Sequence, residues 1–256
     1  MTLLQAIVLA AVALLAGAIN SVAGGGSFLT FPTLILSGVP PVQANATNTV
    51  ALWPGIVASI GGYRKELAGR RDLLVLAVIS LAGGVVGAYL LLHTPQSTFT
   101  RLIPFLLLFA TLLFAFGGRI ALALRRRLGT SRASSRALAV IVAVLQFVIA
   151  VYGGYFGGGI GILMLASLSL MGMENMHRMN AVKTVLAACI NGVAVVTFIV
   201  ARAVFWPQAI VMTLGAIIGG YGGATLARRL PPQAVRWFVI AVGLGMSVLF
   251  FINPKV

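Results

Sequence analysis

Acidic residues are almost missing from this sequence. It has three Asp and Glu residues among 256, and its first charged side chain of either sign is Arg64. Charged residues make up 8% and hydrophobic residues 60% of the chain, and its mean hydropathy is +1.08. This composition indicates that lipid surrounds most of the chain. We expect the uncharged first 63 residues to span the membrane and not to be a cleaved signal peptide.

Other absences narrow the classes of function. The one cysteine, Cys189, lies inside an apolar run, so the sequence predicts no disulfide framework and no Cys/His metal site. The acids Glu66, Asp72 and Glu174 lie near the ends of apolar runs, which leaves no carboxylate in mid-membrane for a proton or Na⁺ relay. No pairing of a nucleophile with a base is visible. We therefore expect no enzymatic activity, no cofactor and no metal.

Basic residues give the chain a net charge of +15, a value that invites a role in nucleic-acid binding. They cluster, however, in the gaps between apolar runs, as is typical of cytoplasmic loops beside an anionic leaflet. We therefore expect the partner to be the lipid bilayer and not nucleic acid. The two largest clusters are Arg64, Lys65, Arg70 and Arg71, and then Arg119, Arg125, Arg126, Arg127, Arg132 and Arg136.

Eight apolar runs follow one another, and most have the length of one membrane-spanning helix of about 20 residues. The runs are Leu3–Val39, Val42–Gly62, Leu73–Leu92, Leu102–Gly118, Ala137–Gly172, Met179–Ala201, Trp206–Ala227 and Trp237–Ile252. The first and the fifth run would be more than about 50 Å long as straight helices, against a hydrocarbon core of about 30 Å.

Each of the two long runs contains a glycine triplet, Gly24–Gly26 in the first and Gly157–Gly159 in the fifth. Consecutive glycines lower helix propensity and permit a tight reversal of the chain. We predict that each long run forms two helices, the second of them short, with the short helices starting at Ser27 and Ile160.

The two halves of the chain align with each other. The glycine triplets match, "NATNTV" matches "NAVKTV", and "GGVVGAY" matches "GGYGGAT". The first glycine of each triplet precedes Asn45 by 21 residues and Asn180 by 23, and the next glycine pair follows after 38 and 39 residues. Three matches in order at near-equal spacing indicate a duplication. We predict a first repeat in residues 1–118, a basic cytoplasmic linker in 119–136 and a second repeat in 137–256.

Whether the repeats are parallel or inverted depends on the number of crossings in each half. Four crossings would make them parallel, and five would make them inverted. The inverted arrangement places Arg178, Arg228, Arg229 and Arg236 inside, as the positive-inside rule favours, and the parallel one places them outside. The sequence therefore predicts an all-α polytopic membrane protein with two inverted repeats of about five helical segments each, and with an outside start.

The repeated hexapeptide carries the polar side chains that could bind a ligand. Positions i, i+3 and i+4 share one face of a helix, and the first turns of a helix favour an anion. Discontinuous helices with N-termini near the midplane form the usual site of inverted-repeat transporters. We therefore predict one substrate site built by both halves, from Gly24, Gly25, Gly26, Ser27, Asn45, Asn48, Thr49, Gly157, Gly158, Gly159, Asn180, Lys183 and Thr184.

Structural explanations for the same residues stay open. Asn and Thr in membrane helices often form hydrogen bonds between helices, and the glycine triplets could serve only as bends. Lys183 lies about five residues inside its run and could extend to the cytoplasmic interface.

The segment "GAINSVAGGGSFLTFPTLILSGVPPVQANATNTVALWPG", followed by "GGYRKEL", resembles the TauE/SafE family of sulfite and organosulfonate exporters. The segments "YGGYFGGGIGILMLASLSLMG" and "NAVKT" resemble the second half of that family. The likeness covers nearly the whole chain. It implies a multi-pass permease of the bacterial inner membrane for small sulfur-containing anions. Together with the predicted site, we expect export of sulfite or a small organosulfonate by alternating access.

The alternatives are a permease for another small anion, such as a carboxylate, and a non-transporting membrane subunit that scaffolds an enzyme. The sequence leaves the substrate, the direction of transport and the oligomeric state open, a homodimer included. Proton coupling through His93, His177 or the substrate itself is open as well.

Overall fold

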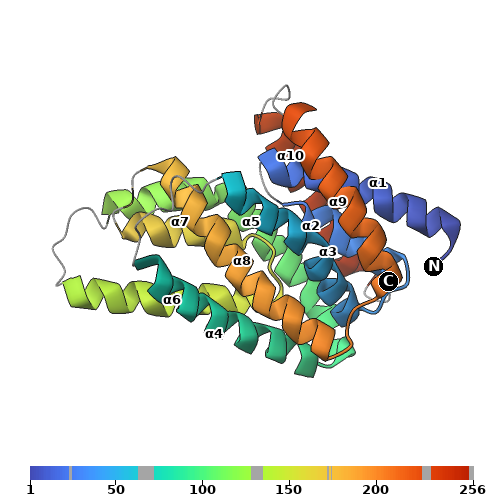
Figure 1. Cartoon of the computed structure of the whole chain (residues 1–256), viewed down its shortest axis with the longest axis horizontal. Helices are drawn as coiled ribbons and strands as arrows, with labels where there is room; N and C mark the ends of the chain where they lie inside the picture. The colour runs from blue at the N-terminus through green and yellow to red at the C-terminus, as the bar shows by residue number, and fades with distance from the viewer. Residues whose placement is uncertain are drawn as a thin grey trace.

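The computed structural model of the chain describes residues 1–22, 25–62, 72–127, 135–171, 173, 175–226 and 232–253. These residues form ten α-helices and no strand (Figure 1). The helices are α1 Leu3–Val22, α2 Ser27–Leu36, α3 Pro41–Gly62, α4 Asp72–His93, α5 Gln96–Arg127, α6 Ser135–Tyr155, α7 Ile160–Leu170, α8 Met176–Val200, α9 Trp206–Leu226 and α10 Pro232–Ile252.

The predicted division of the two long runs is confirmed. The short helices α2 and α7 begin at Ser27 and Ile160, directly after the glycine triplets. Gly25, Gly157 and Gly159 have φ angles of +94°, +79° and +75°, a region that side chains with a Cβ rarely adopt. The glycines therefore end α1 and α6 and reverse the chain.

Helices α1 and α2 form a hairpin. The side-chain nitrogen of Gln5, near the start of α1, donates to the carbonyl oxygen of Ser37, directly after α2, at 3.2 Å. A ten-residue helix such as α2 is only about 15 Å long, so the hairpin brings its glycine turn into the interior of the helix bundle.

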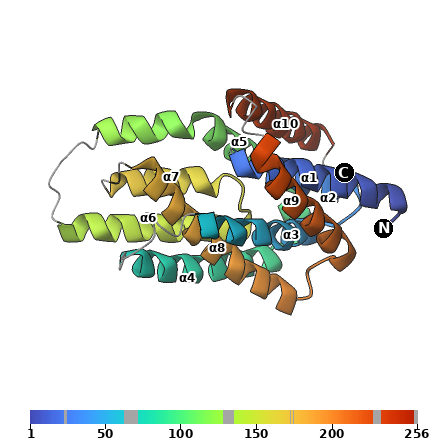
Figure 2. The ribbon, with the colours of Figure 1, turned by 45° about the horizontal axis from the view of Figure 1, so that its top comes forward.

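Equivalent helices of the two halves, α1 and α6 through α5 and α10, have equivalent packing partners. Helix α1 packs along α9 as α6 packs along α4, and these pairs lie at opposite edges of the molecule in both views (Figures 1 and 2). Likewise, α3 contacts α9 as α8 contacts α4, and α2 contacts α10 as α7 contacts α5. Helix α3 also packs on α8, its own equivalent, and α5 on α10. These described helices thus make matching contacts in the two halves of the chain.

Glycines bring the backbones together in both outer pairs. A Cβ atom added at Gly219 of α9 would clash with the carbonyl oxygen of Leu14 in α1. One added at Gly87 of α4 would clash with the carbonyl oxygen of Val151 in α6. Small residues allow such close approach, and the resulting van der Waals packing is one of the forces that associate helices in lipid.

Helices α3 and α8 meet at the centre and run antiparallel. The indole nitrogen of Trp53 donates to the carbonyl oxygen of Ala188 at 3.1 Å, and the Trp53 ring lies against Gly192. Nearer the start of α3, the hydroxyl oxygen of Thr47 accepts a hydrogen bond from the backbone nitrogen of Phe205, which follows α8, at 3.0 Å. Trp53 and Ala188 occupy equivalent positions when "NATNTV" is aligned with "NAVKTV".

The distribution of apolar side chains shows that the protein is a multi-pass membrane protein. Within the described ranges, four helices are long and apolar enough to cross a membrane, in α1, α4, α5 and α8. Large apolar side chains at their surface, such as Leu3, Leu74 and Val200, are 69–80% exposed, whereas Phe31, Phe99 and Phe198 are buried in the core. Exposed apolar side chains of this kind suit contact with lipid.

Candidate functional site

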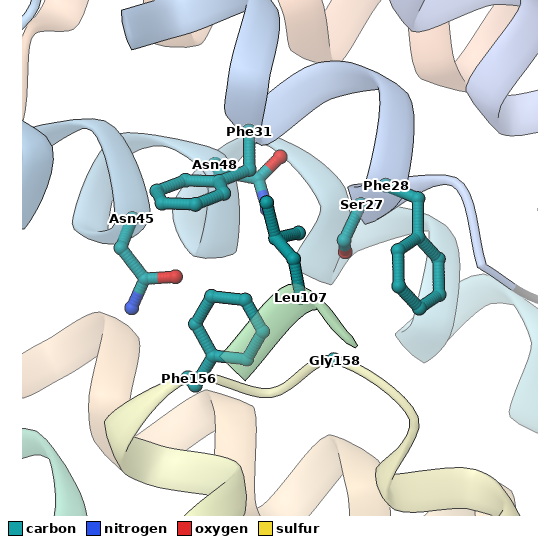
Figure 3. Close-up of a pocket in the computed structure, with 8 residues that line it drawn as sticks. All are labelled: Ser27, Phe28, Phe31, Asn45, Asn48, Leu107, Phe156 and Gly158. Carbon is teal, nitrogen blue, oxygen red and sulfur yellow. The ribbon is translucent and has the colours of Figure 1, made fainter. Parts of the chain in front are cut away.

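A small cavity lies where the first half of the chain meets the glycine turn of the second half (Figure 3). Its volume is about 10 Å³, which is enough for about one water molecule. The polar side chains of its lining, Ser27, Asn45 and Asn48, all come from the first half, together with the apolar Phe28, Phe31 and Leu107. The cavity is lined by Ser27, Phe28, Phe31, Asn45, Asn48, Leu107, Phe156 and Gly158.

Asn48 offers hydrogen-bond donors to this cavity. Its side chain is 4% exposed, and its carbonyl oxygen accepts a hydrogen bond from the Thr30 hydroxyl at 2.5 Å. That bond orients the amide and leaves its Nδ2 without a hydrogen-bond partner among the described residues. A neutral amide donor held in this way can bind an anion without an ionised group.

Ser27 adds donors from the first turn of α2. In the described part of the chain, neither its hydroxyl nor its backbone N–H donates a hydrogen bond within the protein, and α2 has no side-chain cap at its N-terminus. The free N–H groups and the dipole of a helix favour negative charge at this end. Figure 3 shows Ser27 across the cavity from Gly158.

Asn45 is engaged differently from Asn48. Its Nδ2 donates to the backbone carbonyl of Tyr155, at the end of α6, at 3.0 Å. Figure 3 shows its side-chain oxygen turned towards the lining residues and its nitrogen turned away. In this conformation Asn45 presents an acceptor to the cavity, and it links α3 to the second half of the chain.

The second half contributes its glycine turn. Gly158 lines the cavity, and its carbonyl oxygen accepts a hydrogen bond from the Tyr152 hydroxyl at 2.8 Å. Gly157 and Gly159 flank it without lining the cavity and supply the positive φ angles of the turn.

The second polar trio lies away from the cavity. The Lys183 ammonium donates to the side-chain oxygen of Asn180 at 3.0 Å, and the aliphatic part of Lys183 packs against Gly161 of α7. Because α3 and α8 run antiparallel through the Trp53–Ala188 contact, Lys183 and Asn48 lie on opposite sides of that contact.

The remaining predicted residues make local contacts. The hydroxyls of Thr49 and Thr184 donate to the carbonyl oxygens of Asn45 and Asn180, one turn earlier, at 2.9 and 2.8 Å. Gly25 provides the turn before α2, and the backbone N–H of Gly26 donates to the Asn20 side chain at 2.8 Å. Gly24 lies outside the described residues.

None of the eight residues that line the cavity is ionisable. Over the ranges that the structure covers, no group of three His, Cys, Asp or Glu side chains could hold a metal ion. The chemistry available in the cavity is therefore hydrogen bonding from neutral donors, next to a wall formed by Phe28, Phe31, Phe156 and Leu107.

Two residues near the cavity were not predicted from the sequence. Thr30 is fully buried and positions Asn48, and Tyr155 accepts the hydrogen bond of Asn45. A hydroxyl in the apolar stretch "SFLTFPT" is a signal that could have identified Thr30, because buried polar groups need partners. A tyrosine beside a glycine triplet gives no comparable signal for Tyr155.

The role of Thr30 can be tested with the variant Thr30→Val, which keeps the shape and removes the hydroxyl. We expect a two- to tenfold lower rate for whatever process uses Asn48, because one hydrogen bond contributes about 0.5–1.5 kcal/mol. Thr30→Ser, which keeps the hydroxyl, should retain the wild-type rate. A valine variant with full activity would show that Asn48 needs no fixed orientation.

Comparison with known proteins identifies one family of membrane transporters and several relatives that are named as transporters. The family model described as "Sulfite exporter TauE/SafE" matches residues 9–250. The chain is 28% identical over 245 residues to "Probable membrane transporter protein ORF9" of Sinorhizobium sp, an alignment that covers 94% of this chain and 90% of the relative. It is 27% identical over 242 residues to a "Probable membrane transporter protein" of Haemophilus influenzae, with 94% and 92% covered.

A third relative is "Probable membrane transporter protein YfcA" of Escherichia coli, with 29% identity over 239 residues and 92% and 86% of the two chains covered. No solved structure matches the chain significantly.

Proposed function

We propose that this chain, which belongs to the TauE/SafE sulfite exporter family, exports a small sulfur-containing anion across the bacterial inner membrane. The anion is sulfite or an organosulfonate. Membership of a family of membrane transporters means that the protein is not an enzyme. The inner membrane is supported by the basic clusters between the apolar runs, which suit cytoplasmic loops.

The observation that carries the proposal is the cavity between the two halves. Its polar side consists of the Asn48 amide and the free donors of Ser27, at the N-terminus of α2. Sulfite and sulfonate groups present oxygen acceptors that such donors can bind. The apolar wall suits the organic part of an organosulfonate.

Alternating access between two inverted repeats is supported by two features. The equivalent helices α3 and α8 run antiparallel, as they must if one half is inverted relative to the other. The cavity holds about 10 Å³, room for only about one water molecule, so the substrate requires a more open conformation than this one.

Lys183 is proposed to bind the anion transiently on the cytoplasmic side of the cavity, along the transport pathway. It lies across the Trp53–Ala188 contact from Asn48, and its ammonium would attract an anion towards the cavity. With a negative cell interior, a monoanion leaves the cell downhill by about 2.3 kcal/mol per 100 mV. This carrier needs no coupling ion. The cavity is built from one chain, so a homodimer would contain two carriers.

Sulfite flux into proteoliposomes under an imposed membrane potential tests the proposal. Wild-type protein should transport sulfite, and Lys183→Ala should be slower by about fivefold or more, because a unit charge a few ångströms away contributes on the order of 1–4 kcal/mol.

The matched control is Arg202→Ala, which removes an exposed charge from the α8–α9 connection. Equal loss of flux in both variants would assign the effect to net charge and not to Lys183. Absence of wild-type flux with both sulfite and organosulfonates would overturn the proposed substrate class, and carboxylate flux would replace it.

A further inference from the structure

The cavity cannot admit a substrate until one of its walls moves. The wall formed by Phe156 and Gly158 belongs to the only non-helical stretch of the lining that the structure describes, residues 156–159. Gly157 and Gly159 have positive φ angles and lack the side chains that would restrict a change of backbone conformation. This wall can therefore change its backbone conformation without breaking a helix.

Tyr155, which directly precedes this stretch, is fastened to the first half of the chain at three points. Its backbone carbonyl accepts from Asn45 Nδ2 at 3.0 Å. Its hydroxyl lies 3.3 Å from the hydroxyl of Thr94, in the α4–α5 connection. Its ring packs edge-on against Phe99 of α5, with 5.7 Å between ring centroids. Each contact joins the two halves, and each must be lost if the halves separate here.

Asn45 connects this attachment to the cavity. Its Nδ2 is used by Tyr155, and its side-chain oxygen faces the lining residues (Figure 3). An anion is repelled by an amide oxygen and attracted by an amide N–H. To bind an anion, the Asn45 amide must rotate, and rotation withdraws its donor from the Tyr155 carbonyl.

We propose that Tyr155 is the latch of the external gate, which means that its three contacts with the first half keep the cavity closed towards the side away from the cytoplasm. Binding of an anion at Asn45 releases this latch. The release by an anion rests on the proposed function, and the external position of the latch rests on the inverted topology. The gate is external because Thr94 and Gln96 follow α4 at the same end of the bundle as the start of α3, where Gln96 accepts a hydrogen bond from the backbone N–H of Val42 at 3.1 Å. In the inverted topology this end faces away from the cytoplasm.

Labelling of a single cysteine in the cavity tests the latch without any transport measurement. Leu107→Cys, in a Cys189→Ala background, is exposed to a membrane-impermeant cationic methanethiosulfonate reagent from either face of oriented vesicles. Tyr155→Phe should raise the labelling rate from the external face about two- to tenfold, the effect of losing one hydrogen bond. Thr94→Val should do the same. The double variant should match the single ones, because both remove one bond.

Tyr89→Phe is the matched control, since Tyr89 is exposed and stacks on His93 away from the cavity; its labelling rate should stay at the wild-type value. Unchanged labelling in Tyr155→Phe, or a rise from the cytoplasmic face, would overturn the external latch. Additive effects of Tyr155→Phe and Thr94→Val would assign them to separate local disturbances and overturn it as well.

The release by an anion is tested by sulfite flux in the same variants. A weaker latch raises the fraction of protein molecules whose cavity is open and can bind sulfite. The KM for sulfite should therefore fall by the same factor by which the labelling rate rises. An unchanged KM together with faster labelling would overturn the coupling and keep the latch. Faster labelling in a protein that transports no sulfite would likewise keep the latch and remove the proposed substrate.

Discussion

Gly219→Ala is expected to destabilise the protein by about 3 kcal/mol, which corresponds to a melting midpoint lower by roughly 10 °C. The added methyl group would overlap the backbone carbonyl of Leu14. A backbone atom cannot rotate out of the way as a side chain can, so α1 and α9 must move apart along their shared length. The loss of close packing weakens the van der Waals attraction that helps to associate helices in lipid. Thermal unfolding of the purified protein in detergent measures the shift.

The neighbouring residue provides the control. A Cβ at Gly220 would have Gly17 as its nearest neighbour, at 3.9 Å, which is ordinary contact distance. Gly220→Ala should therefore leave the midpoint unchanged or raise it slightly, because alanine has the higher helix propensity. Gly87→Ala should repeat the loss in the α4–α6 pair. Equal melting midpoints for the variants at 219 and 220 would show that the backbones of α1 and α9 are not so close that only glycine fits between them.

Asn48→Asp is expected to lower sulfite flux by at least about 100-fold. The substitution keeps the shape of the side chain but places a carboxylate where the proposed substrate binds. Two like charges about 4 Å apart repel by on the order of 4 kcal/mol at the effective dielectric of a protein surface, and 1.4 kcal/mol is a factor of ten. Flux into proteoliposomes at equal protein content measures the loss.

Two variants separate this repulsion from other causes. Asn48→Ala removes the donor without adding charge and should cost about tenfold, the upper range for one hydrogen bond. Asn253→Asp makes the same chemical change at an exposed position after α10 and should transport normally. If Asn48→Asp transported as fast as Asn48→Ala, the bound species would carry no negative charge at this position.

Features that depend on neighbouring residues in the chain were predictable. The starts of α2 and α7 follow from glycine triplets, whose low helix propensity acts locally. The apolar run Leu102–Gly118 covers only part of α5, which continues to Arg127. Hydropathy marks the part of a helix that lies in lipid, and a helix can continue into water with arginines on its last turns. The boundaries of the repeats and the linker remain predictions.

Contacts between distant helices were not predictable. The bond between Thr30 and Asn48 joins α2 to α3, and the bond between Asn45 and Tyr155 joins the two halves. Sequence spacing identifies the face on which a side chain lies, but it does not identify which helix packs on that face. The expectation that Asn48 and Lys183 share one site is still a prediction, because they lie on opposite sides of the α3–α8 contact in this conformation.

The pairing of α1 with α9 also sets an order of assembly during synthesis. Helix α4 meets its glycine-packed partner α6 soon after it is made, whereas α9 begins about 180 residues after α1 ends. At about 5–20 residues per second, α1 waits on the order of 10 s or more for its partner. Lipid must solvate α1 during that time. A first helix without a single charged side chain is suited to this delay, and a charge on the face that later meets α9 would hinder insertion well before it affected the finished protein.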